Sequence, residues 1–211
     1  SLSLETGFSE EKINLLIKSW ANTSNDADPR ALGMQSAVCE LFGMELSKYQ
    51  KDGLMDSVEA WGRWNDPEYS VELYDTIKED GKVLLKAMYD KTQRELKAAG
   101  IDKIILYRGV QGVVAHVDDI LKDKANAMGS WSLNPDTAKD FAMRGELGQE
   151  EEFLKGVVYQ TEIPSERILS IPKTGFGCLN EFEYVVLGLP KGQIDTVRVT
   201  FSAEDIPVEI E

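Results

Sequence analysis

A change of hydrophobic pattern near Gly100 constrains the fold of this 211-residue chain most strongly. Before it, apolar residues recur at helical spacing, most clearly in KVLLKAMYDKTQRELKAAG, where Gly100 stands where a C-terminal cap residue belongs. After it, apolar residues come in short runs separated by Gly, Pro and Asn, which is typical of β-strands. The sequence therefore predicts an α+β fold, with a helical lobe over residues 1–100 and a β core over residues 101–211.

Local signals predict further helices, the first of them with Ser9 as N-cap and Glu10 and Glu11 in its first turn. The stretch RALGMQSAVCELFGMEL, residues 30–46, has apolar residues at helical spacing despite its glycines. Asn134 is a favoured N-cap residue, and Pro135 suits the first helical position. We therefore expect a short helix that begins directly after the SWS segment.

The length of the chain suffices for one good core or two small ones, and we expect one domain over residues 1–211. The two cysteines, Cys39 and Cys178, lie in unrelated contexts, so the sequence predicts neither a disulfide framework nor a zinc site. The start SLSLETG has no signal-peptide pattern and lacks an initiating Met. We expect such a start from a processed product or an excised domain.

The net negative charge of the chain limits the kinds of partner that it can bind. The chain has 23 basic and 37 acidic residues and a formal net charge of -14. Non-specific attraction to nucleic acid and to anionic membranes depends on excess Lys and Arg, so both partners are disfavoured. No apolar run approaches the roughly 18 residues of a membrane-spanning helix. We therefore expect no membrane partner, and nucleic acid is a weaker candidate than protein.

The predicted strand KIILYRG ends in a residue that could bind an anion. Alternation places Arg108 on the same face as Ile104 and Leu106, where a charged guanidinium needs hydrogen-bond acceptors. An ordinary ion pair with one of the many acidic residues would satisfy it. A bidentate clamp on a phosphate or carboxylate is the functional alternative.

Two hydroxyls flank an aromatic residue in the predicted strand SWS. Ser130 and Ser132 alternate around Trp131 and share one strand face. Such hydroxyls can orient a carboxylate or a ribose hydroxyl, because each can both donate and accept a hydrogen bond. Two hydroxyls on one strand face are common, and by themselves they are explained by an incidental polar face.

A pair of carboxylates opens the predicted strand EFEYVV. Glu181 and Glu183 lie about 7 Å apart on one face, from a rise of about 3.3 Å per residue, and that face continues into Val185 and Leu187. A solvated edge strand would explain the pair. At the mouth of an apolar strand, two carboxylates could instead serve as a general base and as a stabiliser of positive charge.

In this order the three signals resemble the mono-ADP-ribosyltransferases of the Arg-Ser-Glu class, a fold shared by many bacterial toxins. In that family an Arg closes an early strand, a Ser-x-Ser strand precedes a helix with an Ala and an aromatic residue, and E-x-E opens a later strand. The matching segments here are LYRG, SWSLNPDTAKDFA and NEFEYVVLG, within residues 104–188. The segment ILSIPKTGFGCLNEFEYVVLG also looks like the ADP-ribosyltransferase modules in phage head-associated proteins and polymorphic bacterial toxins. Trp131 is a departure, since the family most often has Thr there.

The resemblance implies the ADP-ribosyltransferase fold, with a helical lobe packed on a mostly antiparallel two-sheet β core and an NAD cleft that needs no metal. Arg108 would bind the NAD phosphates, and Ser130 would hydrogen-bond Glu183. Glu183 would hold the 2′-hydroxyl of the nicotinamide ribose and stabilise the ribosyl cation as nicotinamide leaves. Glu181 would orient and help deprotonate the nucleophile. Other residues implied to bind NAD are Gly109, Trp131, Ser132 and Phe141.

The family's recognition loop precedes E-x-E, and here this segment is KTGFGCLN. Phe176, Cys178 and Asn180 are its implied recognition residues, with Phe176 as the aromatic contact. In the family, E-x-E accompanies arginine acceptors, and a guanidinium needs a nearby carboxylate to become nucleophilic. The resemblance therefore implies transfer to an arginine of a protein. The segment MRGELGQEEEF would be a flap beside the NAD cleft.

Three alternatives remain open at this point. An NAD glycohydrolase would use the same residues with water as acceptor. A glycoside hydrolase would use two carboxylates but gives no reason for Arg108 and Ser130. An acidic interaction or virion module could keep the fold without activity. His116, the only histidine, is expected to be a helix or loop residue.

As a toxin or effector domain, the chain would be delivered or secreted into a target-cell cytoplasm, with an immunity protein or antitoxin as partner. A phage-encoded protein is the other possibility.

Overall fold

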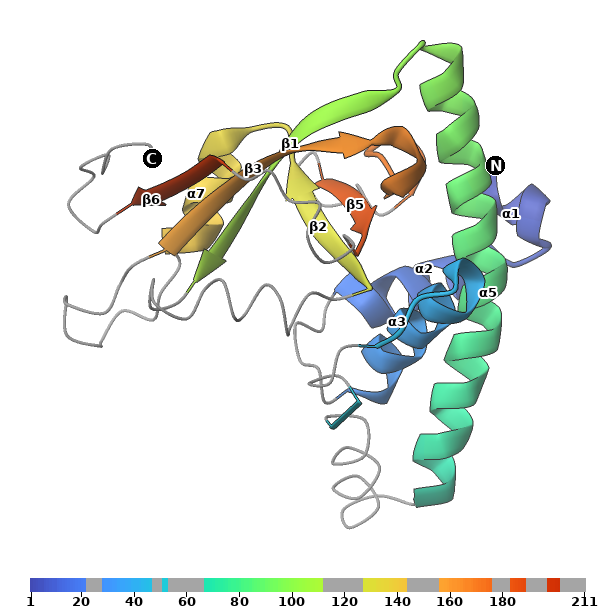
Figure 1. Cartoon of the computed structure of the whole chain (residues 1–211). Coiled ribbons are helices and arrows are strands. Elements are labelled where there is room, and N and C mark those ends of the chain that lie inside the picture. Colours follow the sequence, from blue (N-terminus) through green and yellow to red (C-terminus); the bar gives the residue numbers. More distant parts are fainter. Residues whose placement is uncertain are drawn as a thin grey trace. The chain divides into compact units, whose positions relative to one another are not determined.

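The structure, a computed structural model, describes residues 1–21, 28–46, 51–52, 67–111, 127–143, 156–175, 183–188 and 197–201. The chain divides into two compact units, one made of Ser1–Lys91 with Asp123–Met128 and the other of Thr92–Lys122 with Gly129–Glu211. The boundary near Lys91 falls inside the long helix α5 (Pro67–Ala98). The last turns of α5 therefore belong with the strands, and the two units are described separately below (Figure 1).

The first unit is helical. It contains α1 (Leu2–Thr6), α2 (Glu10–Ala21), α3 (Pro29–Phe42) and the larger part of α5. Its core is formed by fully buried side chains from three of these helices: Leu16, Leu32, Met34, Leu84, Leu85 and Met88. None of the helices within the described ranges is long and apolar enough to cross a membrane.

Helix α3 is shorter than its apolar pattern predicts. Asp28 caps its N-terminus by accepting a hydrogen bond from the Arg30 backbone N–H, and Pro29 fills the first helical position. The predicted helix over residues 30–46 stops at Phe42, because Gly43 takes the left-handed conformation (φ 62°) and donates its N–H to the carbonyl of Cys39. The prediction that residues 43–46 are helical is thus wrong, because it treated Gly43 as an interior residue of the helix.

Small residues let α3 and α5 approach closely. A Cβ on Gly81 would lie 2.9 Å from Met34 Sδ, and one on Gly33 would lie 3.0 Å from Ile77 Cγ2. A side chain at Gly33 would also meet the Tyr74 carbonyl oxygen at 3.0 Å, and one at Gly81 would require Met34 to move. Both glycines are therefore packing residues of the helical unit.

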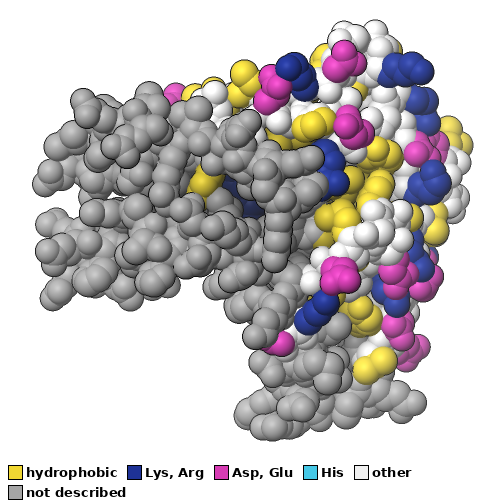
Figure 2. Space-filling view, viewed as in Figure 1, with side chains coloured by type: hydrophobic (Ala, Val, Ile, Leu, Met, Phe, Trp, Pro, Cys, Tyr) yellow, Lys and Arg dark blue, Asp and Glu magenta, His cyan; other side chains and the backbone are white. Residues whose placement is uncertain are grey.

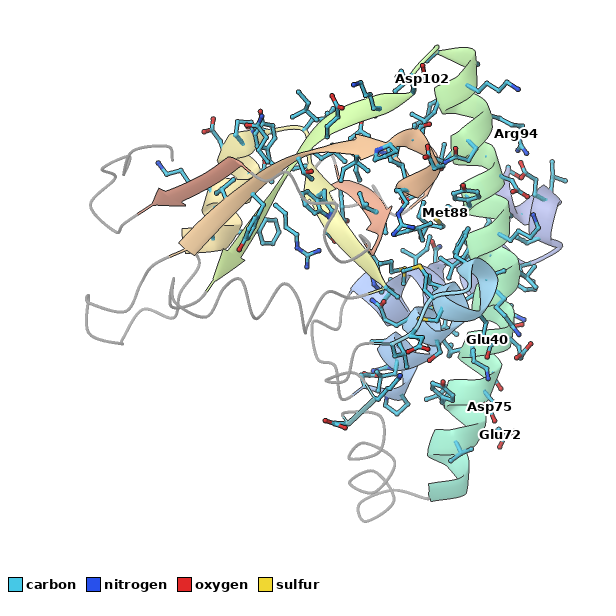
Figure 3. The ribbon with its side chains drawn as sticks, in the orientation of Figure 1. Glu40, Glu72, Asp75, Met88, Arg94 and Asp102 are labelled. Atoms are coloured by element: carbon cyan, nitrogen blue, oxygen red, sulfur yellow. The ribbon has the colours of Figure 1, made fainter. Side chains whose placement is uncertain are left out.

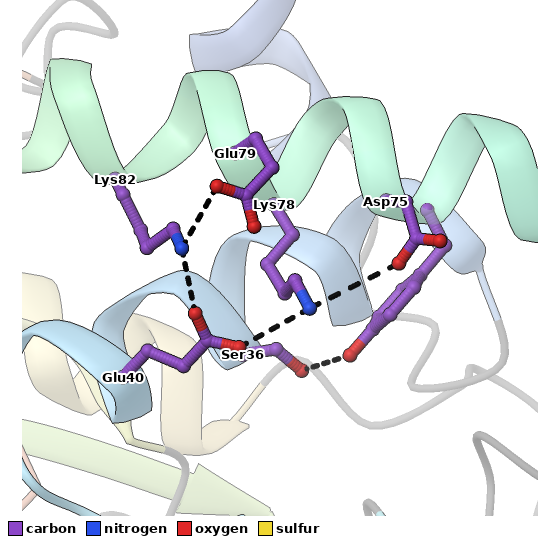
Figure 4. A network of polar contacts seen from close by, with 7 residues as sticks. Ser36, Glu40, Asp75, Lys78, Glu79 and Lys82 are labelled. Carbon is purple, nitrogen blue, oxygen red and sulfur yellow. Dashed lines mark hydrogen bonds and ion pairs between the residues drawn. The ribbon is translucent and has the colours of Figure 1, made fainter.

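Ion pairs cover the outer side of the same helix pair (Figure 4). Glu40 of α3 contacts Lys78 (3.1 Å) and Lys82 (2.8 Å) of α5, and Lys82 also contacts Glu79 (2.9 Å). Hydrogen bonds from Lys82 and Lys78 hold the pKa of Glu40 below its usual value. Figure 3 places Glu40 beside the part of α5 that carries Asp75. Figure 2 shows acidic and basic side chains interleaved over the described surface in view. These pairs are partly exposed to solvent, and such surface pairs each contribute little to stability.

The second unit is built on a sheet. Its strands are β1 (Lys103–Gln111), β2 (Met128–Ser132), β3 (Gly156–Pro164), β4 (Ile168–Ser170), β5 (Glu183–Leu187) and β6 (Val197–Phe201), with Met128 grouped with the first unit. The strand order is β4-β5-β2-β1-β3-β6. The pairs β1–β2, β1–β3, β3–β6 and β4–β5 are antiparallel. The α+β class, with a helical part and an antiparallel sheet, is confirmed.

The expected arrangement of two sheets is not what the described strands form. They make one six-stranded sheet. The reason is that β5 pairs with β2, so the antiparallel pair β4–β5 joins the strands around β1 instead of forming a second layer. The number of sheets is a property of long-range pairing and cannot be read from the alternation within each strand.

Adjacent residues of β1 belong to different apolar clusters. Leu106 packs in a cluster that contains Leu96 of α5, Trp131 and Val186. Tyr107 packs on the other side, against Ala138 and Ala142 of α7 (Pro135–Met143) and Val158 of β3. Alternation along β1 thus directs its side chains into two separate packing layers.

Two predicted caps are confirmed. Gly100 has a positive φ of 67° and ends α5, while the N–H of Ile101 bonds to the carbonyl of Leu96. Asn134 accepts a hydrogen bond from the Asp136 backbone N–H at 2.9 Å, and α7 begins at Pro135. Both are local signals, and local signals suffice for helix ends.

Candidate functional site

The three sequence motifs lie on three neighbouring strands. Glu183 is the first residue of β5, Ser130 and Ser132 lie in β2, and Arg108 lies in β1. In the strand order, β2 stands between β5 and β1. Segments widely separated in the sequence are therefore brought to one region of the sheet (Figure 1).

Arg108 reaches toward the middle strand of the three. A Cβ on Gly129 would overlap Nη1 of Arg108 and would lie 3.2 Å from Cζ. The guanidinium thus rests against the backbone of β2, the strand between Arg108 and Glu183. A glycine at this position leaves the space that the guanidinium occupies.

Electrostatics link Arg108 to Glu183. Burial lowers the pKa of the Arg108 guanidinium, and the negative charge of Glu183 opposes this shift. Because an arginine side chain stays protonated in proteins, Arg108 is a partly buried positive charge under the influence of a carboxylate. A further anion beside this charge would be stabilised.

The two serines have different surroundings. Ser132 is buried and pairs with Tyr107 of β1, and its hydroxyl accepts a hydrogen bond from the Asn134 backbone N–H at 3.0 Å. That bond shapes the turn from β2 into α7. Ser130 is exposed in the middle of β2 and remains available for a ligand or another side chain.

Strand alternation separates these groups by face. Trp131 and Tyr184 both pack against the cluster that contains Leu106, so Ser130 and Glu183 are directed to the opposite side of the sheet. Arg108 follows Leu106 on the side of the cluster by the same rule. By alternation Ser130 and Glu183 thus share one face, whereas Arg108 starts from the other face and its guanidinium reaches Gly129, where the charge of Glu183 still acts on it.

The other residues expected to bind NAD are placed as follows. Gly109 lies under α7, where a Cβ would overlap the carbonyl oxygen of Ala138, so its lack of a side chain serves helix packing. Trp131 is 9% exposed and packs in the core, and Phe141 of α7 is 37% exposed. Of these three, only Phe141 presents a large exposed apolar surface.

Several predicted residues lie outside the described part of the chain. They are Glu181, the recognition residues Phe176, Cys178 and Asn180, the segment MRGELGQEEEF apart from its first residue, and His116. Their roles stay predictions.

Gly129 belongs to the candidate site, although the sequence motifs did not predict it. A glycine inside a strand that also holds Trp131 is a signal for close approach of another group, and this signal was present in the sequence. Which group approaches it depends on the pairing of β2 with β1 and could not be read from β2 alone.

Within the described ranges, no group of three His, Cys, Asp or Glu side chains is arranged to hold a metal ion. Comparisons of this chain with family models, curated proteins and solved structures find no match.

Proposed function

We propose that the chain is a mono-ADP-ribosyltransferase that transfers ADP-ribose from NAD to an arginine of a protein and releases nicotinamide. The observation that carries the proposal is the placement of Arg108 and Glu183 on strands that flank β2, with the guanidinium against Gly129 and under the influence of the Glu183 charge. The resemblance of the three motifs to the Arg-Ser-Glu class supports the same reading, as does the α+β architecture.

The proposed chemistry assigns each group a task. Arg108 binds the NAD phosphates through its fork of N–H donors. Glu183 accepts a hydrogen bond from the 2′-hydroxyl of the nicotinamide ribose and stabilises the oxocarbenium-like cation that forms as the bond to nicotinamide breaks. Ser130 lies on the side of the sheet to which Glu183 is directed, which supports a role in fixing the Glu183 rotamer.

We propose an arginine as the acceptor because the E-x-E motif supplies a second carboxylate, Glu181. Glu181 draws a proton from the attacking guanidinium, which then forms the bond to the ribose C1′. The net charge of -14 favours a protein over a nucleic acid as target. The biological setting we propose is a toxin or effector domain that acts in a target-cell cytoplasm, with an immunity protein or antitoxin as a possible partner.

The test is nicotinamide release from NAD by the full chain. Glu183→Ala should lower the rate by roughly two to four orders of magnitude, since it removes the central electrostatic group. Glu162→Ala is the matched control, because Glu162 is an exposed carboxylate of the same sheet that pairs only at the surface with Lys103. It should retain the wild-type rate.

Transfer is distinguished from hydrolysis by labelled NAD added to bacterial and eukaryotic lysates. Glu181→Gln should lose transfer to protein while keeping NAD hydrolysis. Hydrolysis without any protein labelling by the wild type would assign the site to an NAD glycohydrolase. If neither the wild type nor Glu183→Ala released nicotinamide, the enzymatic proposal would be wrong and an interaction module would be favoured.

A further inference from the structure

A buried polar contact ties α5 to the turn that follows β4. The hydroxyl oxygens of Thr92 and Thr174 lie 2.6 Å apart. Their residues are 0% and 1% exposed. A hydrogen bond between two buried hydroxyls is costly to break, because water cannot replace the lost partner.

The turn itself is closed around Thr174. The Ile171 backbone N–H donates to Thr174 Oγ1 at 3.0 Å, and the Thr174 backbone N–H donates to the Ile171 carbonyl at 2.9 Å. Thr174 Oγ1 therefore joins the turn to Thr92 of the helix. Movement of the turn relative to α5 would break the bond between Thr92 and Thr174.

The next residue of α5 holds the segment just before the turn. Gln93 Nε2 donates to the carbonyls of Ser165 and Ile168, each at 2.9 Å. Both N–H groups of the Gln93 amide are thereby used. One stretch of α5 thus contacts the chain from residue 165 to residue 174.

Strand pairing alone gives this segment little support. Strand β4 has 3 residues, and its pairing with β5 is irregular, with Ile168 opposite Val186 and Ser170 opposite Val185. A ladder this short contributes few hydrogen bonds. The contacts from α5 therefore add a constraint, beside the burial of β4 itself, on where the chain leaves β4.

We infer that Thr92 and Gln93 are positioning residues of the proposed site. They hold residues 165–174, which include β4, and β4 pairs with β5, the strand that begins at Glu183; they act without touching NAD. The inference rests on the proposed function. We call the hydrogen bonds from Thr92 and Gln93 to residues 165–174 the anchor. Because Arg108 lies on a different strand, loss of the anchor should lower kcat while leaving KM for NAD nearly unchanged.

The experiment compares two substitutions of one buried side chain in the full-length chain. Thr92→Val keeps the shape and removes the hydroxyl, whereas Thr92→Ser keeps the hydroxyl. Lys173→Ala is a control at the same turn, because Lys173 pairs with Glu95 at the surface and is 71% exposed. Melting temperatures establish that all variants are folded, and hydrogen exchange follows the amides of Ile171 and Thr174.

Thr92→Val should speed exchange at these two amides by about tenfold, the effect of one net hydrogen bond. It should also lower kcat for nicotinamide release by roughly ten- to hundredfold. Thr92→Ser and Lys173→Ala should behave as wild type in both measurements.

Each contrary outcome has a separate meaning. Unchanged exchange in Thr92→Val would overturn the anchor, and faster exchange with unchanged kcat would overturn its role in positioning. Equal losses in Thr92→Ser and Thr92→Val would assign the effect to methyl packing instead of the hydroxyl. A wild-type chain that does not cleave NAD would overturn the proposed function and the catalytic part of this inference, while exchange would still decide the anchor.

Discussion

The guanidinium of Arg108 occupies the space that a side chain at Gly129 would fill. This relationship joins β1 to β2 at the point where the candidate site is formed, since β2 lies between Arg108 and Glu183 in the sheet. Arg108 can hold this position only if residue 129 has no side chain, whatever ligand the site binds.

Replacement of Gly129 should therefore displace Arg108. We expect Gly129→Ala to lower nicotinamide release from NAD by roughly ten- to hundredfold, because a new Cβ would overlap Nη1. Gly100→Ala is the control: Gly100 has a φ of 67°, and a Cβ there meets nothing within 4 Å. That variant should lose about 1 kcal/mol of stability from backbone strain but keep its activity.

A double-mutant cycle tests the mechanism. In an Arg108→Ala background, Gly129→Ala should have little further effect on the rate, since the displaced group is already absent. Additive losses from the two substitutions would show that Gly129 acts independently of Arg108.

The side chain of Gln35 should be critical for the stability of the helical unit. Its amide accepts the Met128 N–H at 3.0 Å and donates to the Met128 carbonyl at 3.2 Å, and Gln35 is 5% exposed. Gln35→Met keeps the volume but leaves two buried backbone groups without this partner, at about 1–3 kcal/mol each. Urea unfolding should show the loss. Glu40→Gln, an exposed change on the same helix, should cost much less, and equal losses would contradict the assigned role.

Acid should weaken the N-cap of α3. Burial raises the pKa of Asp28, but hydrogen bonds from Arg30 outweigh it and hold the pKa below its ordinary value of 3.8. A lowered pKa means that the ionised carboxylate stabilises the fold above the unfolded pKa, and that this contribution is lost as pH falls through the folded pKa. The stability difference between wild type and Asp28→Asn, measured by urea unfolding, should shrink between about pH 5 and pH 2.

Asp28→Ala removes the cap as well as the charge. It should cost about 1 kcal/mol at neutral pH, whereas Asp28→Asn retains the accepting oxygen. A difference between wild type and Asp28→Asn that did not vary with pH would mean that the charge of Asp28 contributes nothing.

Cys39 should be protected from alkylation in the folded chain. It is 8% exposed, and burial raises the pKa of its thiol to about 11. At pH 8 only about one thiol in a thousand would then be ionised, and the thiolate is the reactive form. A Cys178→Ser variant isolates this thiol for measurement. Labelling should be slow in buffer and fast in denaturing urea; fast labelling in buffer would contradict the buried position.

Local features of the fold were predictable because their causes are local. The end of α5 at Gly100 and the start of α7 at Asn134 and Pro135 depend on residues within one helical turn. The end of α3 was misplaced because Gly43 can be either an interior or a cap residue, and only its backbone conformation distinguishes the two.

The candidate site was predictable in composition and only partly in geometry. The sequence predicted that Arg108, Ser130 and Glu183 act together, and the strand order places their strands side by side. It did not predict that Arg108 would extend from the opposite face, nor that Gly129 would receive its guanidinium. These features depend on the partner of each strand, which alternation does not specify.

The amino-acid sequence by itself determined the α+β class, the change of structure near Gly100 and the residue types that could carry chemistry, because periodicity and capping act over a few residues. Tertiary structure decided that the described strands form one sheet and that the end of α5 anchors the turn at Thr174. The physical reason is that strand order and buried hydrogen bonds join residues far apart in the chain, and their free energy depends on the complete set of contacts.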